Sequence, residues 1–216
     1  MRRDRYADRV EAGRVLAESL GRFIGKNPVV VGLPRGGVVV AAEVSRALGG
    51  DLDVIIAGKL RAPQNPELAI GAITEEGAAY VNKDVLGYMR ITEEYLEEEK
   101  KRRLEVIRER LRSYRGVKPK VPLAGRTVIV VDDGLATGST MISAVQAAHA
   151  SGAGEIVVAV PGGPPDTVER ISEMEEVSEV VCPLMPRMFF AVSQLYEDFH
   201  QIEDSEVMDI LREFAR

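Results

Sequence analysis

Short apolar runs alternate with longer amphipathic stretches along most of this chain. Five runs are too short for stable helices and have the composition of buried strands: 29–31, 51–57, 127–131, 155–160 and 178–182. Three stretches between successive runs have the pattern of helices: 38–48, 139–151 and 166–176. This alternation predicts an α/β fold in which helices flank a parallel twisted sheet.

The pattern changes near both ends of the chain and between residues 58 and 81. Residues 7–25 predict a helix whose apolar face carries Val10, Leu16, Leu20 and Ile24. Residues 58–66 contain two prolines and two cations and predict a loop, and the next stretch predicts a hairpin around Glu75-Glu76-Gly77. A last amphipathic helix is expected to begin near Asp204.

A very different stretch, residues 92–115, contains seven acidic and eight basic residues. Its apolar residues form one narrow stripe at helical spacing: Leu96, Leu104, Ile107, Leu111 and Tyr114. This pattern predicts a long, solvated helix. Its apolar stripe needs a surface to pack against, and one interpretation is a second copy of the chain in a homodimer.

Composition narrows the class of protein. The 216 residues suit one large domain spanning 1–216, and one cysteine and two histidines exclude an internal disulfide and a Cys/His metal cluster. No apolar run approaches the roughly 18 residues of a membrane span, and the charged N-terminus lacks a secretory pattern, so we expect a cytoplasmic protein. The formal net charge of −6 disfavours broad binding to nucleic acid but allows a local phosphate site.

The segment from Val128 to Thr140 carries the strongest chemical pattern. A buried strand ends at two adjacent carboxylates, Asp132 and Asp133, at the sheet edge where open α/β folds bind ligands. A loop of small residues and then a helix follow, so unpaired backbone N–H groups are available for a phosphate. Carboxylates repel phosphate, but they accept hydrogen bonds from sugar hydroxyls or bind a metal ion. The segment therefore predicts a site for a phosphorylated pentose.

This 13-residue segment resembles the ribose-phosphate-binding motif of type I phosphoribosyltransferases, which use 5-phosphoribosyl-1-pyrophosphate (PRPP). The resemblance implies that Asp132 and Asp133 bind the ribose hydroxyls and that PRPP also contacts Gly134, Ala136, Thr137, Gly138, Ser139 and Thr140. Gly134 departs from the family, which more often has an aliphatic residue there. A P-loop is excluded because Ser139 rather than lysine follows Gly138, and no GxGxxG pattern is present here. The alternative is an ordinary Asp-Gly turn before a helix.

Two further segments match this family by their positions. The loop after the first strand resembles the family's pyrophosphate-binding loop, and its candidate contacts are Pro34, Arg35, Gly36 and Gly37. Lys59 and Arg61 follow the second strand, where the family has another pyrophosphate contact, and Glu67 is a candidate for orienting a cation or Mg²⁺. The alternative for the first segment is a plain turn, and for the second a solvated pair of cations.

The charged stretch 92–115 lies where this family has a flexible catalytic loop. The resemblance therefore implies that residues 82–118 form a helical lid over the site. Packing of the apolar stripe against a partner subunit is the alternative.

Residues 183–216 are expected to form a C-terminal hood, since aromatic residues concentrate there in a chain with 5% aromatics. A similar segment stacks the base in purine-using relatives, which makes Phe190 and Tyr196 candidates for binding the acceptor. The alternative is that these rings belong to the core of a small subdomain.

The resemblance as a whole implies transfer of the 5-phosphoribosyl group of PRPP to a nitrogen nucleophile such as a nucleobase, with release of pyrophosphate. Asp132 and Asp133 would hold Mg²⁺, and they are candidate catalytic residues together with Arg35 and Lys59. Two other functions stay open: a regulatory protein that senses PRPP or a nucleotide without turnover, and an assembly protein built around residues 92–115. The net charge and the lack of a basic arm disfavour a regulator that binds nucleic acid.

Overall fold

Five parallel strands form the central sheet of the protein. The structure is a computed structural model, and it describes residues 5–56, 58–63 and 65–215, without the side chains of 66–69, 83 and 84. The strand order is β2-β1-β6-β7-β8. In that order, the strands are Asp51–Val54, Val29–Gly32, Thr127–Val131, Glu155–Ala159 and Glu179–Val181. The predicted parallel sheet is therefore confirmed.

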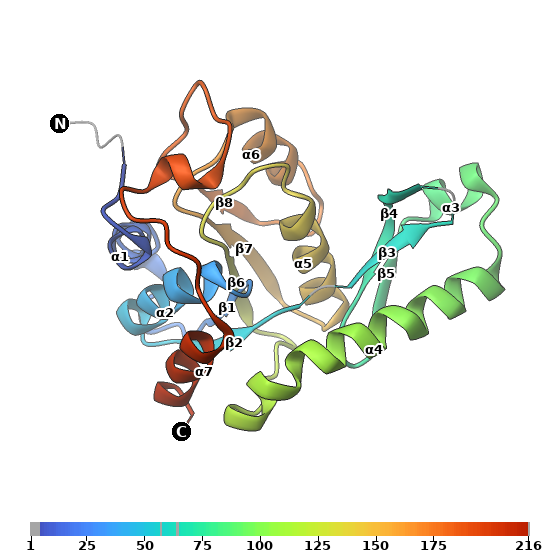
Figure 1. Cartoon of the computed structure of the whole chain (residues 1–216), viewed down its shortest axis with the longest axis horizontal. Helices are drawn as coiled ribbons and strands as arrows, with labels where there is room; N and C mark the ends of the chain where they lie inside the picture. The colour runs from blue at the N-terminus through green and yellow to red at the C-terminus, as the bar shows by residue number, and fades with distance from the viewer. Residues whose placement is uncertain (1–4, 57, 64, 216) are drawn as a thin grey trace.

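Helices cover both faces of this sheet (Figure 1). Three cover one face: α1 (Arg9–Ser19), α2 (Gly36–Leu48) and α7 (Asp204–Glu213). Two cover the other: α5 (Ser139–Ala150) and α6 (Pro165–Ser172). Along β1, Val30 packs toward α2, whereas Val29 and Val31 pack toward α5. Burial on both faces explains why the strands are apolar runs rather than alternating ones.

The N-terminal segment contacts the segment before α7 at one side of the sheet. Tyr6 forms an isolated bridge with Tyr196, which follows the short 3-10 helix η2 (Val192–Leu195), and the Tyr6 hydroxyl donates to Pro161 O at 2.9 Å. The predicted helical face is wrong at Ile24, which is 63% exposed. The reason is that α1 ends at Ser19, and the 3-10 helix η1 (Gly21–Phe23) then turns the chain.

A second unit, which we call the arm, projects from the sheet (Figure 1). It consists of β3 (Gly58–Ala62), β4 (Asn65–Ile73), β5 (Ala79–Val81), α3 (Lys83–Met89) and α4 (Glu93–Val117). The predicted hairpin and long helix are confirmed. The predicted loop 58–66 is wrong, because Leu60 and Ala62 are buried and Arg61 is exposed, an alternation that suits a strand paired with β4.

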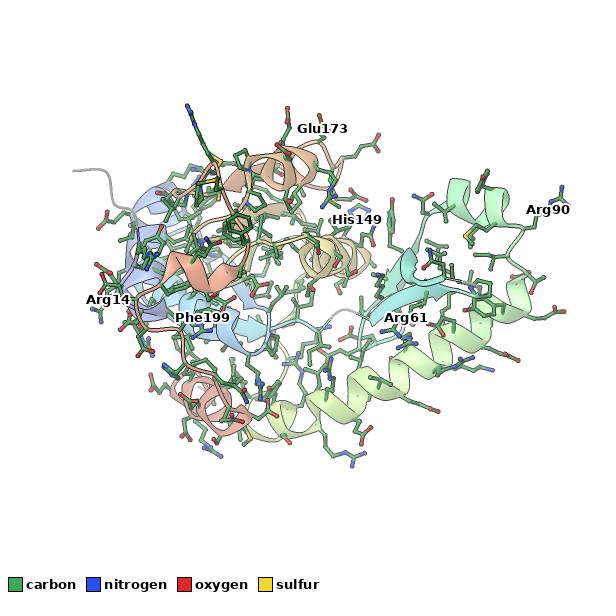
Figure 2. The ribbon with its side chains drawn as sticks, turned by 45° about the horizontal axis from the view of Figure 1, so that its top comes forward. Arg14, Arg61, Arg90, His149, Glu173 and Phe199 are labelled. Carbon is green, nitrogen blue, oxygen red and sulfur yellow. The ribbon has the colours of Figure 1, made fainter. Side chains whose placement is uncertain are left out.

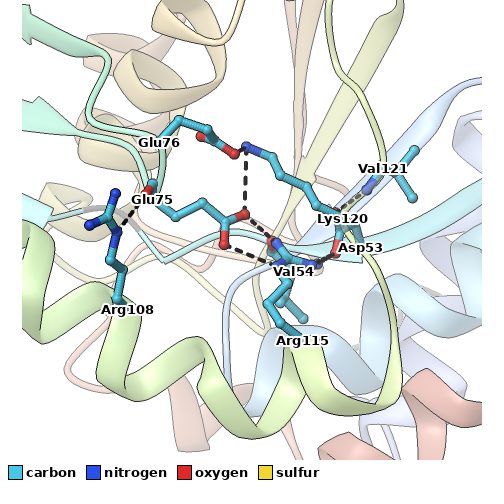
Figure 3. A network of polar contacts seen from close by, with 8 residues as sticks. All are labelled: Asp53, Val54, Glu75, Glu76, Arg108, Arg115, Lys120 and Val121. Carbon is cyan, nitrogen blue, oxygen red and sulfur yellow. Dashed lines mark hydrogen bonds and ion pairs between the residues drawn. The ribbon is translucent and has the colours of Figure 1, made fainter.

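A charged network joins the arm to the central sheet (Figure 3). Arg115, near the end of α4, contacts Asp53 of β2 at 2.6 Å and Glu75 of the hairpin at 2.5 Å. Lys120 also pairs with Glu75, at 3.5 Å. The side chain of Asp53 is 2% exposed and accepts two further hydrogen bonds from backbone N–H groups. The last part of α4 is therefore held against the sheet by ion pairs. Within the described ranges, no helix has the length and apolarity needed to cross a membrane.

Candidate functional site

The loop between β6 and α5 offers a row of backbone N–H groups. In the part of the chain that the structure describes, the N–H groups of residues 136–140 have no hydrogen-bond acceptor. Gly138 directly precedes α5 with a φ of +72°, a left-handed conformation that favours glycine. We call residues 136–140 the N–H cradle. It combines unpaired donors with the positive end of a helix dipole, which is the chemistry of a phosphate site.

The carbonyl side of the cradle is anchored to α6. Thr167 Oγ1 donates to Ala136 O at 3.0 Å, and the Arg170 guanidinium donates to Thr137 O. Because C=O and N–H of one planar trans peptide group point in opposite directions, the N–H groups of Thr137 and Gly138 face away from α6. The contacts with α6 therefore orient the donors before any ligand arrives.

The two loops that the sequence analysis treated separately pack directly against each other. They follow neighbouring strands, since Gly32 of β1 is paired with Val131 of β6. A Cβ atom at Gly36 would lie 2.0 Å from Asp133 Oδ2, and one at Gly37 would lie 2.8 Å from the backbone of Asp132. Glycine is needed at both positions because a side chain would displace the paired carboxylates.

Arg9 of α1 is a site residue that the sequence analysis missed. Its Nε donates to Asp133 Oδ2 at 2.8 Å, and its Nη1 donates to His200 O at 2.9 Å. The guanidinium carbon lies 3.9 Å from the ring centroid of Phe199, and the whole residue is 6% exposed. One signal was present in the sequence: Arg9 lies seven residues before Leu16 on the buried face of the helix, where a charge needs a partner.

The two carboxylates have different electrostatic environments. Asp133 is paired with a cation, whereas half-buried Asp132 accepts the N–H of Asp133 at 2.9 Å. Burial and the negative charge of Asp133 raise the pKa of Asp132 well above its ordinary value. Hydrogen bonds from ligand hydroxyls, or a cation, would favour the charged form of this acid.

A cleft of 620 Å³, which we call the front cleft, lies at the C-terminal ends of β1 and β2. Residues 33–35 form one wall, and Thr140 of the N–H cradle reaches the cleft from α5. The peptide bond between Pro34 and Arg35 is cis. Arg35 lies 3.4 Å from Glu203, and its side chain is 38% exposed. The cleft thus connects the cradle with the Pro-Arg-Gly-Gly loop.

The front cleft is also lined by residues that the sequence analysis did not name as site residues. Arg110 and Tyr114 of α4 line it together with Asp204 of α7. The Tyr114 hydroxyl donates to Asp204, and burial together with this carboxylate raises the pKa of Tyr114. The apolar stripe of the helix had suggested packing for Tyr114. Its place at a cleft depends on how α4 crosses the ends of the strands.

The two cations expected beside the pyrophosphate loop lie in the arm. Gly58 faces α4, so strand alternation directs Lys59 to the opposite face, toward α5. Arg61 lies beside α4 (Figure 2), and its carbonyl accepts a hydrogen bond from the Tyr95 hydroxyl at 2.9 Å. Neither cation is among the described residues that line the front cleft. The side chain of Glu67 lies outside the described part of the structure.

The C-terminal segment contacts the carboxylate loop from one side. Tyr196 is 3% exposed, and its hydroxyl donates to Asp133 O at 2.5 Å, so this ring supports the loop from within the core. Phe190 is instead 82% exposed. A Cβ atom at Gly134 would lie 2.7 Å from Val192 Cγ1. The departure from the family at Gly134 therefore coincides with close packing of the C-terminal segment.

The donor set for a metal ion consists of Asp132 and Asp133. Among the residues with described positions, no three His, Cys, Asp or Glu side chains gather as in a dedicated metal centre. Magnesium is commonly bound by one or two carboxylates together with water and substrate phosphates. These two residues therefore fit a Mg²⁺ ion that shares its ligands with a bound phosphorylated substrate.

Known proteins share both the sequence and the fold. The model of the phosphoribosyl transferase domain family matches residues 7–180. A Mycobacterium tuberculosis protein, provisionally named a phosphoribosyl transferase, is 43% identical over 214 residues, which are 97% of this chain and 48% of that protein. The chain thus spans about half the length of the curated relatives it matches. The crystal structure of the protein TT1426 from Thermus thermophilus is 45% identical, with a TM-score of 0.91 over 98% of this chain and 100% of that chain. Because the family model covers most of its length, this chain belongs to the phosphoribosyl transferase domain family.

Proposed function

We propose that this protein transfers the 5-phosphoribosyl group of PRPP to a nitrogen nucleophile, such as a nucleobase, and releases pyrophosphate. The observation that carries the proposal is the N–H cradle at residues 136–140 next to the carboxylates Asp132 and Asp133. One ligand with a phosphate at one end and a diol at the other satisfies both features. Membership of the family supports the same conclusion.

The ribose phosphate binds between the two features. The 5′-phosphate accepts hydrogen bonds from the cradle, and the hydroxyls of Thr137, Ser139 and Thr140 add donors. Asp132 and Asp133 accept hydrogen bonds from the ribose hydroxyls. Arg9 and Tyr196 act as positioning residues, because they contact Asp133 rather than the substrate.

The pyrophosphate group binds along the Pro-Arg-Gly-Gly loop. Gly36 and Gly37 allow this loop to pack closely against the carboxylates. Arg35 exchanges its contact with Glu203 for a contact with phosphate oxygens. Lys59 and Arg61 stay candidates for this role, although reaching the cleft requires a movement of the arm. Mg²⁺ held by Asp132 and Asp133 would neutralise charge on the leaving pyrophosphate.

The transfer breaks the bond between ribose C1 and a pyrophosphate oxygen, which leaves with the bonding electrons. Positive charge then develops on the sugar ring, as in glycoside cleavage, and the two carboxylates stabilise it. The acceptor nitrogen forms the new bond to C1, and its proton passes to the released pyrophosphate. Residues 82–118 contribute the α4 wall of the cleft and act as a lid that excludes water from this step.

The acceptor is expected to bind at the mouth of the front cleft under the hood formed by residues 183–216. Phe190 is the stacking candidate with an open ring, whereas Tyr196 is buried under the carboxylate loop. Arg110, which also lines the cleft, offers donors, and the Tyr114 hydroxyl oxygen can still accept a hydrogen bond. This arrangement supports a planar, nitrogen-containing acceptor without naming one.

The test is pyrophosphate release from PRPP and Mg²⁺ with a panel of purines, pyrimidines and amino-imidazoles. Asp133→Asn should lower turnover at least tenfold, about 1.4 kcal/mol in the barrier, because the ribose loses a charged acceptor. The matched control is Asp166→Asn, an exposed acid in the first turn of α6, which should keep full activity. Undiminished transfer by Asp133→Asn would overturn the assignment. PRPP binding without release for any acceptor would favour a sensor instead.

A further inference from the structure

A second cavity lies on the opposite edge of the sheet from the front cleft. This rear pocket has a volume of 680 Å³ and is lined by the start of β2, the end of α2, the segment after α4 and the end of α7. Figure 1 shows the last turns of α4 and α7 beside each other below the sheet. Asp51 begins β2 and Arg126 precedes β6, so the pocket lies at the N-terminal ends of the strands.

Lys118 is the unusual residue of the rear pocket. It lines the pocket although it is only 7% exposed. Among the described residues 5–56, 58–63 and 65–215, none forms a hydrogen bond or an ion pair with the Lys118 ammonium group. The other cations in the lining do have carboxylate partners: Arg46 with Glu213, Arg126 with Asp51, and Lys120 with Glu75 and Glu76. The Lys118 side chain is thus nearly buried while its ammonium group has no counter-charge, and an anion bound in the pocket would supply one.

The charge of the pocket lining is opposite in sign to the net charge of the whole chain. The lining contains four cationic and two anionic side chains, an excess of two positive charges, whereas the whole chain has a formal net charge of −6. Each arginine has five N–H donors, so Arg46 and Arg126 can keep their carboxylates and still donate to a ligand. Pro119, Pro122 and Phe214 add apolar surface. Clustered cations beside apolar surface suit a dianion that has an organic body.

We propose that the rear pocket binds a phosphate-bearing small molecule and that Lys118 is its central contact. The phosphate would accept hydrogen bonds from Lys118 and from the outer N–H groups of Arg46 and Arg126. The organic body would lie on the proline and phenylalanine surface. This site is separate from the front cleft and does not depend on the proposed transfer reaction, because the two cavities share no lining residue.

The test uses adenosine 5′-monophosphate and inorganic pyrophosphate as probes, with calorimetry for affinity and hydrogen exchange for location. We expect at least one probe to protect backbone N–H groups in residues 45–52 and 118–126. Lys118→Met should weaken this binding at least tenfold, and Lys118→Arg should retain most of it. Lys101→Met is the matched control, since Lys101 is exposed on α4 outside both cavities. Protection confined to residues 132–140 with both probes, or unchanged affinity in Lys118→Met, would overturn the proposal.

The thermal stability of Lys118→Met without ligand gives a second measurement, because its direction differs between a lysine that binds a ligand and one that only supports the fold. Methionine has a similar length and no charge, so Lys118→Met should raise the thermal midpoint by a few degrees if the ammonium group is kept for binding. A lowered midpoint would show that Lys118 supports the fold, and would contradict the proposal.

Discussion

The central sheet and the arm are attached to their surroundings in different ways. The inner strands β1, β6 and β7 of the sheet are covered on both faces by apolar side chains. The arm shares this apolar core through Leu111 and Tyr114 of α4, and it also meets β2 through the part-buried ion pairs of Arg115 with Asp53 and Glu75. Apolar burial tolerates small changes of position, whereas a buried ion pair depends on two particular groups. The sheet is therefore expected to survive changes that detach the arm.

The largest expected effect follows from removing the cation of this network. Arg115→Met should lower the free energy of unfolding by about 3 kcal/mol, because the nearly inaccessible carboxylate of Asp53 loses its counter-charge. Urea unfolding measures the change. Arg112→Met, an exposed arginine on the same helix, should stay within about 0.5 kcal/mol of the wild type.

A double variant separates the charge from the packing of the arm. Asp53→Asn combined with Arg115→Met removes both charges, so it should recover part of the stability lost by Arg115→Met alone. Equal losses for the two variants would mean that the ion pair does not attach the arm.

A second change acts at the start of α2, next to the carboxylate loop, and should affect activity more than stability. In Gly36→Ala, the new Cβ atom would overlap Asp133 Oδ2, so the carboxylate has to leave its contact with Arg9. We expect pyrophosphate release to fall at least tenfold, about 1.4 kcal/mol in the barrier. The control is Gly87→Ala, where the added Cβ has no atom within 4 Å. A fully active Gly36→Ala would contradict the close packing of the two loops.

The smallest effect concerns the thiol that follows the last strand of the sheet. Burial raises the pKa of Cys182 to about 12. The folded state therefore keeps the proton at a pH where the unfolded thiol ionises, so this contribution is intact below about pH 9 and is lost as the pH rises toward 12. Between pH 8 and pH 10 the wild type should lose about 1 kcal/mol more stability than Cys182→Ala.

Reactivity of the same thiol gives an independent check. Native protein at pH 8.5 should react slowly with iodoacetamide, because the thiolate is the reacting form, and denatured protein should react rapidly. Rapid alkylation of the native protein would show that the end of the sheet is open to solvent.

Local sequence patterns were sufficient to predict the elements that have the same kind of environment on all sides. The strand at 127–131 was predicted with the bounds that the structure has, because a doubly covered strand is apolar along its length, here at Val128–Val131. The loop at 58–66 was predicted wrongly, since two prolines and two cations outweighed a short alternation that becomes informative only when β4 pairs with it.

Contacts between residues that are far apart in the chain could not be predicted from local sequence patterns. The salt bridge between Arg9 and Asp133 joins residues 124 positions apart, and no local pattern relates them. The place of Tyr114 at the front cleft likewise depends on the crossing of α4 over the strand ends.

The amino-acid sequence alone determined the parallel α/β fold, the family resemblance and the position of the small-residue loop before α5, because hydrophobic period, small residues and helix starts are local properties. Only the tertiary structure decided which cations reach the carboxylates, where the arm attaches, and that Lys118 is left without a partner among the described residues. Those outcomes depend on distances between segments that are far apart in the chain, and such distances exist only after the sheet, the arm and both chain ends have packed together.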